Sequence, residues 1–168
     1  MPKASLALDI DGTITTADKK QLTRLRKVMK KEKVPVYINT ARDKAYCKKP
    51  AKSTRRFASK SRHHCLHKKS VKNDNVPRSK MLNMRKIKKD SRVKKSKCCI
   101  LVDDLAENIN YVRKNGFTGI KVKESTGIRK ATVDKIIKRI KSCKRKSKSK
   151  SKRKSKRKSK RKLRSKKM

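Results

Sequence analysis

The chain has 168 residues, of which 58 are Lys or Arg and only 12 are Asp or Glu, so its formal net charge is +46 at pH 7. Such a surface repels itself and favours a polyanionic partner, nucleic acid above all. No signal-peptide pattern follows Met1 and no apolar stretch is long enough to cross a bilayer, so we expect an intracellular protein, nuclear or otherwise associated with nucleic acid.

Two parts of different composition divide the chain. Residues 143–168 contain 17 Lys or Arg, no acid and almost no apolar side chain, so we expect a disordered tail. Three copies of Ser-Lys-Arg-Lys, starting at Ser151, Ser155 and Ser159, are typical of nuclear import or of electrostatic binding to nucleic acid. A tail that only improves solubility is the alternative. The other 41 basic residues and all 12 acids lie in residues 1–142, the predicted domain, whose net charge is therefore +29.

Apolar, strand-like runs alternate with helical patterns within residues 1–142. In chain order we predict strand 5–10, helix 17–32, strand 34–38, a short helix around 81–87, strand 98–102, a helix that includes 109–112 and ends at Gly116, strand 119–122, and a helix from about residue 128. This alternation predicts an α/β fold with a mainly parallel central sheet covered by helices on both faces. Residues 43–79, with 12 basic residues, two acids and two prolines, predict an irregular basic insert that contributes one strand.

Carboxylates follow two of the predicted strands at the point where each strand ends. Asp9 ends the first strand and Asp11 lies two residues later, while Asp103 and Asp104 end the strand over 98–102. Functional groups collect at the carboxyl ends of parallel strands, and Gly12 lets the chain turn sharply enough to bring Asp9 and Asp11 to one site. Because grouped carboxylates are costly without a partner, a divalent cation is expected among them.

The apolar strand followed by Asp9-Ile10-Asp11-Gly12-Thr13 resembles the first motif of phosphatases of the haloacid dehalogenase (HAD) superfamily. The resemblance implies a HAD-like Rossmannoid three-layer sandwich in which Asp9 is the nucleophile that forms an aspartyl-phosphate. It implies that Asp11 is the general acid and then the general base, with Gly12 and Thr13 beside the phosphate. It also implies that Mg²⁺ is bound by the Asp9 carboxylate and the backbone carbonyl of Asp11.

The second and third HAD motifs also have counterparts. An apolar strand that ends in Thr40 resembles the second motif, which implies that Thr40 hydrogen-bonds the transferring phosphoryl group, with Arg42 close behind. The third motif is a single lysine that neutralises charge on the phosphate and the nucleophile. Lys80 is the first choice because it opens a helix-like segment, and Lys86 and Lys88 are alternatives.

The fourth motif is an apolar strand that ends in two acids, as in Ile100-Leu-Val-Asp103-Asp104. The resemblance implies that Asp103 binds Mg²⁺ directly and that Asp104 binds it mainly through water. Asn108 or Glu107, on the helix that follows, completes the outer shell.

The resemblance extends to a group with little or no cap domain over the site, because the only long insert, 43–79, is too short for a large cap. An open, basic site favours a phosphate on a macromolecule, as in the polynucleotide and phosphoprotein phosphatases of the superfamily. The pattern is also similar to short HAD-like proteins of large DNA viruses. We therefore expect a Mg²⁺-dependent phosphatase that acts on a nucleic-acid end. A phosphoprotein phosphatase and a non-enzymatic nucleic-acid-binding or packaging protein are the alternatives, and the oligomeric state stays open.

Cysteine and histidine residues raise two further possibilities. Zinc could be bound by a cluster comprising Cys47, His63, His64, Cys65 and His67. Their spacing lacks the paired arrangement of typical zinc sites, so a short strand or a basic loop is favoured there. Five cysteines, with Cys98 and Cys99 adjacent, suit a reducing setting, and we expect these two to pack in the core.

Overall fold

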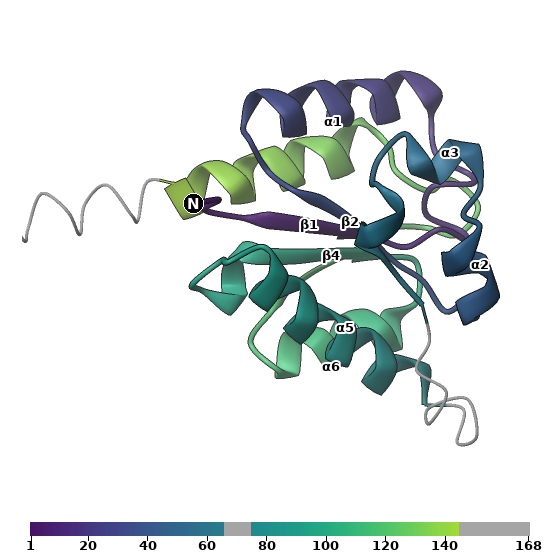
Figure 1. Ribbon diagram of the computed structural model, residues 1–168. Helices are drawn as coiled ribbons and strands as arrows, with labels where there is room; N and C mark the ends of the chain where they lie inside the picture. Colours follow the sequence, from purple (N-terminus) through teal and green to yellow (C-terminus); the bar gives the residue numbers. More distant parts are fainter. Residues whose placement is uncertain (66–74, 145–168) are drawn as a thin grey trace, which may run out of the picture.

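A five-stranded parallel sheet forms the centre of the molecule in the computed structural model, which describes residues 1–65 and 75–144 (Figure 1). The strands are β1 (Ser5–Leu8), β2 (Val36–Asn39), β3 (His63–His64), β4 (Cys99–Asp103) and β5 (Thr118–Lys121). Their order in the sheet is β3-β2-β1-β4-β5, and every neighbouring pair is parallel. The predicted α/β class is therefore confirmed.

The three central strands are short apolar runs because both of their faces are covered. Every residue of β1, β2 and β4 is buried. Leu6 of β1 pairs with Val36 on one side and Ile100 on the other, so β1 lies at the middle of the sheet. Parallel strands between two helical layers require such unbroken hydrophobic sequence, which is why the strands could be recognised.

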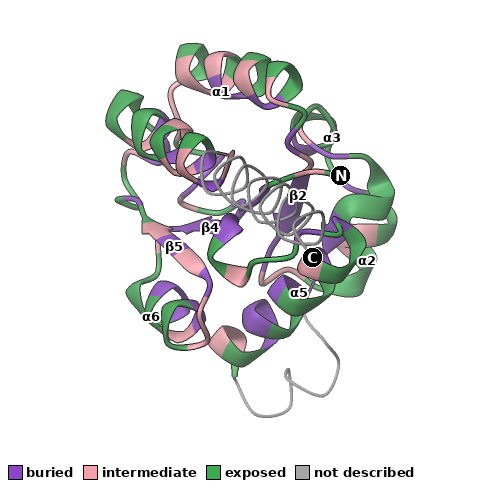
Figure 2. Cartoon of the chain, turned by 90° about the vertical axis from the view of Figure 1, so that its left-hand side faces the viewer, coloured by how far each residue is buried: buried purple, intermediate pink, exposed green. Residues whose placement is uncertain are grey.

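Helices cover both faces of this sheet. On one face lie α1 (Lys19–Lys31) and the C-terminal helix, which the structure describes over 130–144; on the other lie α5 (Val76–Asp90) and α6 (Ala106–Lys114) (Figure 1). Each of these helices has both buried and exposed residues, as the burial colours in Figure 2 show, and we attribute the buried ones to the side that faces the sheet. The buried helical residues include Leu25, Met29, Met84, Ile87, Ile109, Val112, Val133 and Ile136.

The insert after β2 is more regular than the sequence predicted. Its described part contains α2 (Lys44–Lys48), α3 (Lys52–Arg55), the short 3₁₀ helix η1 (Lys60–Arg62) and β3, and α5 already begins at Val76. Asp43 starts α2 because its side chain accepts a hydrogen bond from the Tyr46 backbone N–H. Two-residue β3 extends the sheet beside β2, as one strand was expected to do. Residues 66–74 lie outside the described part.

Four of the five cysteines are paired in two disulfides. Cys47 of α2 is bonded to Cys65, which directly follows β3, and Cys98, just before β4, is bonded to Cys143 of the C-terminal helix. The predicted boundary of the tail at residue 143 was therefore wrong, because the helix continues through Cys143 and buries it; the rest of the predicted tail, 145–168, lies outside the described residues. Cys98 and Cys99 both pack in the core, as expected, but the two disulfides differ from the reduced cysteines that a reducing setting predicts. Cys99 is the free cysteine, and burial raises the pKa of its thiol. In the described residues, no helix has the length and apolar character needed to cross a membrane.

Candidate active site

The candidate active site lies where β1 and β4 run side by side, at their carboxyl ends. The chain leaves β1 toward β2 on one side of the sheet, whereas β4 and β5 lie on the other, so the order of the strands reverses at this point. Such a reversal opens a crevice at the ends of the two strands. Asp9 and Asp103 lie at these strand ends, and the Asp9 backbone N–H donates to the Val102 carbonyl at 3.0 Å.

A buried lysine bridges these two aspartates. Lys80, on the second turn of α5, is 1% exposed, and its Nζ lies 2.9 Å from Oδ1 of Asp9 and 2.5 Å from Oδ2 of Asp103. The structure thus brings Lys80 into the predicted site. Of the alternatives, Lys86 is exposed, and Lys88 donates to the Ser96 hydroxyl at 3.0 Å.

Burial and the neighbouring charges have opposing effects on the pKa of the Asp9 carboxyl. Asp9 is only 5% exposed, and burial raises its pKa to about 6, while the Lys80 ammonium lowers the pKa and the nearby Asp103 charge raises it. One lysine faces two buried carboxylates, so a further positive charge at this place would stabilise both ionised forms.

Three carboxylates are close enough to bind one cation. Asp9, Asp103 and Asp104 each offer an oxygen within 4.8 Å of the other two. This all-oxygen set is the ligand chemistry that Mg²⁺ and Ca²⁺ prefer. Asp104 is half-buried, and burial raises the pKa of its carboxyl. The residues present therefore fit the divalent cation that the sequence predicted.

The start of α6 holds Asp103 in place. Oδ1 of Asp103 accepts hydrogen bonds from the Leu105 backbone N–H at 2.9 Å and from Nδ2 of Asn108 at 3.0 Å. Of the two outer-shell candidates, Asn108 is buried against Asp103, while Glu107 is exposed. One oxygen of Asp103 is thus fixed by α6, and the other faces Lys80.

Asp11 lies apart from the three-aspartate cluster. Its side chain is 60% exposed and is bound by Arg42 through two hydrogen bonds, from Nε at 3.0 Å and from Nη2 at 2.6 Å. The hydrogen bonds from Arg42 hold the pKa of Asp11 below its ordinary value. The Arg42 guanidinium also lies over the Tyr46 ring, 4.7 Å from the ring centre. Of the two carboxylates that the first motif predicts at one site, Asp9 is thus buried beside Lys80, whereas Asp11 is exposed beside Arg42.

The turn after Asp11 depends on glycine. Gly12 has φ +63°, and a Cβ at this residue would lie 2.5 Å from Oδ2 of Asp104. Gly12 therefore lets the turn approach the Asp104 carboxylate closely. Thr13 is buried, and its carbonyl accepts a hydrogen bond from the Ile128 backbone N–H at 3.2 Å.

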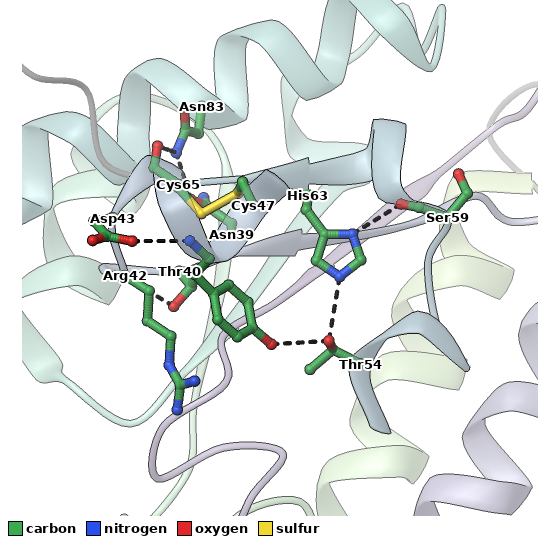
Figure 3. The surroundings of a disulfide bond; sticks show 11 residues. Asn39, Thr40, Arg42, Asp43, Cys47, Thr54, Ser59, His63, Cys65 and Asn83 are labelled. Atoms are coloured by element: carbon green, nitrogen blue, oxygen red, sulfur yellow. Dashed lines mark hydrogen bonds between the residues drawn. A yellow bond between two sulfur atoms is a disulfide. The ribbon is translucent and has the colours of Figure 1, made fainter. Parts of the chain in front are cut away.

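Thr40 lies at the end of β2, the strand next to β1. It is buried, its backbone N–H donates to the His64 carbonyl at 3.0 Å, and its hydroxyl accepts from the Arg42 backbone N–H at 3.3 Å (Figure 3). The structure thus places Thr40 at the same edge of the sheet as the aspartates.

Two buried asparagines, Asn39 and Asn83, hold α5 in place, and the sequence did not predict their contacts. Nδ2 of Asn39 donates to the Lys80 carbonyl at 3.0 Å, and Nδ2 of Asn83 donates to Oδ1 of Asn39 at 3.0 Å and to the Cys65 carbonyl at 3.2 Å (Figure 3). The contacts hold the backbone that carries Lys80. The available signal was a polar Asn39 directly after the apolar run 34–38, since buried polar groups need partners.

The cysteine and histidine cluster does not form a metal site in the described residues. Cys47 and Cys65 are bonded to each other. Nδ1 of His63 lies 2.9 Å from the Ser59 carbonyl and Nε2 lies 3.4 Å from the Thr54 hydroxyl, and burial lowers the pKa of this ring. The His64 ring packs near that of Tyr37. The fifth zinc candidate, His67, lies outside the described residues.

Comparison with known proteins gives a fold likeness without a function. No protein-family model and no curated protein matches the chain. A solved structure of an uncharacterized protein from Corynebacterium glutamicum ATCC 13032 Kitasato is similar, with a TM-score of 0.57 and 14% sequence identity over 82% of this chain and 95% of that one. At this identity the likeness supports the Rossmann-like α/β fold alone.

Proposed function

We propose that this protein is a Mg²⁺-dependent phosphatase of the HAD type, with Asp9 as the nucleophile and a phosphorylated nucleic-acid end as the substrate. The observation that carries the proposal is the buried arrangement of Lys80 between Asp9 and Asp103, with Asp104 beside them, at the crevice between β1 and β4. Four of the residues that the motifs single out meet there, although Asp9 and Asp103 are 94 positions apart in the sequence.

In the proposed reaction, a carboxylate oxygen of Asp9 attacks phosphorus as the bond to the leaving oxygen breaks. Asp11 gives that oxygen its proton, and water then hydrolyses the aspartyl-phosphate, losing a proton to Asp11. Asp9, Asp103 and Asp104 would bind Mg²⁺, which offsets negative charge on the phosphoryl oxygens. Lys80 adds a fixed positive charge beside the attacking group and needs no reorganisation during the reaction.

The contact between Asp11 and Arg42 suggests how substrate enters this cycle. Arg42 stabilises the ionised form of Asp11, which opposes its role as a proton donor. A phosphate is a bidentate partner for arginine as a carboxylate is. In our proposal, bound phosphate therefore competes for Arg42 and frees Asp11 to take up a proton.

The nature of the substrate follows from charge and exposure. The Asp11 and Arg42 side chains are both open to solvent, and the surrounding domain is strongly basic. A macromolecular polyanion fits such a site better than a small metabolite. An intracellular, nucleic-acid-associated location accords with this substrate.

The test is hydrolysis of an aryl phosphate, with and without Mg²⁺, by the wild type and by Asp9→Asn. We expect turnover that requires Mg²⁺ and that falls to background in Asp9→Asn. The matched control is Asp134→Asn, which removes an exposed carboxylate of the C-terminal helix that is paired with Arg24 of α1, and it should leave the rate unchanged. Equal background rates for wild type and Asp9→Asn would exclude the proposed phosphatase activity.

A non-enzymatic nucleic-acid-binding protein is the second candidate, and the +29 charge of residues 1–142 favours it independently of the site. Measuring DNA binding and phosphate hydrolysis with the wild type and Asp9→Asn distinguishes the two functions. If DNA binding is retained and no aryl phosphate or phosphorylated oligonucleotide is hydrolysed, the binding protein is supported. Turnover of phosphopeptides in preference to oligonucleotides would instead support the phosphoprotein phosphatase.

A further inference from the structure

A groove with a volume of about 810 Å³ lies along the outer edge of β3, between α2 and α5. Lys44 and Lys48 of α2, Lys60 of η1 and Lys86 of α5 line it. All four lysines are exposed, and no Asp or Glu is among the described residues that line the groove. Within residues 1–65 and 75–144 none of the four forms an ion pair, so their charges are available to a ligand.

The groove begins next to the candidate active site. Thr40 is hydrogen-bonded to the backbone of His64, which lines the groove. Asn83 also lines it, one helical turn after the buried Lys80. Arg42 lies on the chain just before α2. A chain-like ligand whose end lies at Asp9 can therefore continue along β3.

The walls of this groove are tied together. The disulfide between Cys47 and Cys65 joins α2 to the end of β3, and Asn83 donates to the Cys65 carbonyl at 3.2 Å, which joins α5 to the same point. A preformed groove binds without first having to order its own side chains and loops.

We propose that this groove binds the sugar-phosphate backbone of a single-stranded nucleic acid whose terminal phosphate lies at Asp9. The inference rests on the proposed phosphatase function and specifies the strand that leads away from the reacting group. A nucleic-acid strand presents a negative charge at every nucleotide, which suits cations contributed by three separate elements. A phosphopeptide would bring one phosphate and leave most of the lysines without a partner.

The experiment measures kcat/KM for 3′-phosphorylated oligonucleotides of about 2 to 12 nucleotides, each divided by the value for an aryl phosphate. The groove variant is Lys48→Ala, Lys60→Ala and Lys86→Ala combined. The control variant removes three exposed lysines of α1, on the other face of the sheet, as Lys20→Ala, Lys27→Ala and Lys30→Ala. Both are made in the full chain, so the basic tail and the total charge are the same in the two variants.

We expect the ratio to rise with length in the wild type and in the α1 variant, and to fall about tenfold for the longest strands in the groove variant. The slope of log K against log salt for a single strand should shrink by about 2 in the groove variant, at about 0.7 for each lost phosphate contact. A ratio that does not depend on length, or an equal loss in the two variants, would overturn the proposal that the groove binds the strand. So would a phosphopeptide whose turnover depends on the groove lysines.

A failure of the phosphatase function is seen separately, as an absence of aryl phosphate hydrolysis by the wild type. In that case, fluorescence anisotropy with a labelled 3′-phosphorylated strand decides whether the groove binds nucleic acid. Weaker binding by the groove variant than by the α1 variant supports the groove, and equal binding rejects it.

Discussion

Charge is arranged in opposite ways at the candidate active site and in the lysine groove beside it. At the site, Lys80, Asp9 and Asp103 are buried and in direct contact, and α6 holds Asp103 from behind. In the groove, four exposed lysines lie among lining residues of which, in the described part of the chain, none is acidic. Buried charges depend on one another, so removing one should harm the fold. The groove lysines depend on a partner from outside, so removing one should harm binding alone.

The largest expected effect is that of Lys80→Met. The substitution leaves two buried carboxylates without their cation, which should lower the free energy of unfolding by about 3–5 kcal/mol. Urea unfolding measures this, and Lys86→Met, an exposed lysine on the same helix, should stay within about 0.5 kcal/mol of wild type. Similar losses for both variants would mean that the buried contacts at Lys80 are not what stabilises the site.

Asn83→Ala should have the next largest effect. It leaves Oδ1 of Asn39 and the carbonyl of Cys65 without the donor that satisfies them, a loss of about 2–3 kcal/mol. Because Asn39 also holds the backbone at Lys80, we expect turnover to fall with stability. The control is Asn110→Ala, an exposed asparagine on α6, which should be close to neutral in both measurements.

Gly12→Ala tests the turn that carries the predicted catalytic acid. The left-handed backbone costs an alanine about 1–2 kcal/mol, and the added methyl group must displace the Asp104 carboxylate. Gly116→Ala is the matched control, because it has a positive φ as well but no atom within 4 Å of its Cβ. Calorimetric titration with Mg²⁺ should show weaker binding for Gly12→Ala than for Gly116→Ala, and equal affinities would place the cation elsewhere.

Arg42→Ala should have the smallest effect on stability. Its pair with Asp11 is exposed, so we expect a loss below about 1 kcal/mol, similar to that of Arg24→Ala, which breaks the comparable pair with Asp134. The two variants should differ in kinetics: Arg42→Ala raises KM for aryl phosphate and Arg24→Ala does not. Unchanged kinetics in both would remove Arg42 from phosphate binding.

The parts of the site that the sequence could predict are those encoded next to apolar strands. Asp9 and Asp103 follow buried runs, and parallel strands bring such ends together. Lys80 was one of three candidates, and only the packing of α5 distinguishes it from Lys86. Their catalytic roles, and the Mg²⁺, stay predictions for the experiments above.

What could not be predicted depends on contacts between segments without a local pattern. Arg42 reaches Asp11 across 31 residues, and both are exposed, so no hydrophobic period indicates the pair. The bond between Cys47 and Cys65 is one of many pairings that five cysteines allow. The helices of the insert were missed because α2 and α3 have five and four residues, too few for a helical period to be recognised.

The disulfide between Cys98 and Cys143 has a practical consequence for binding measurements with the protein immobilised on a sensor chip. It fixes the last described turn of the C-terminal helix at the beginning of β4, whereas Asp103 lies at the other end of that strand, about 16 Å away at the usual rise per residue. In Figure 1 the yellow-green end of the described C-terminal helix lies on the left of the sheet, and β4 runs from there toward the right. A sensor chip that captures the protein through a label on the last described turn of this helix should therefore leave the aspartates facing the flowing sample.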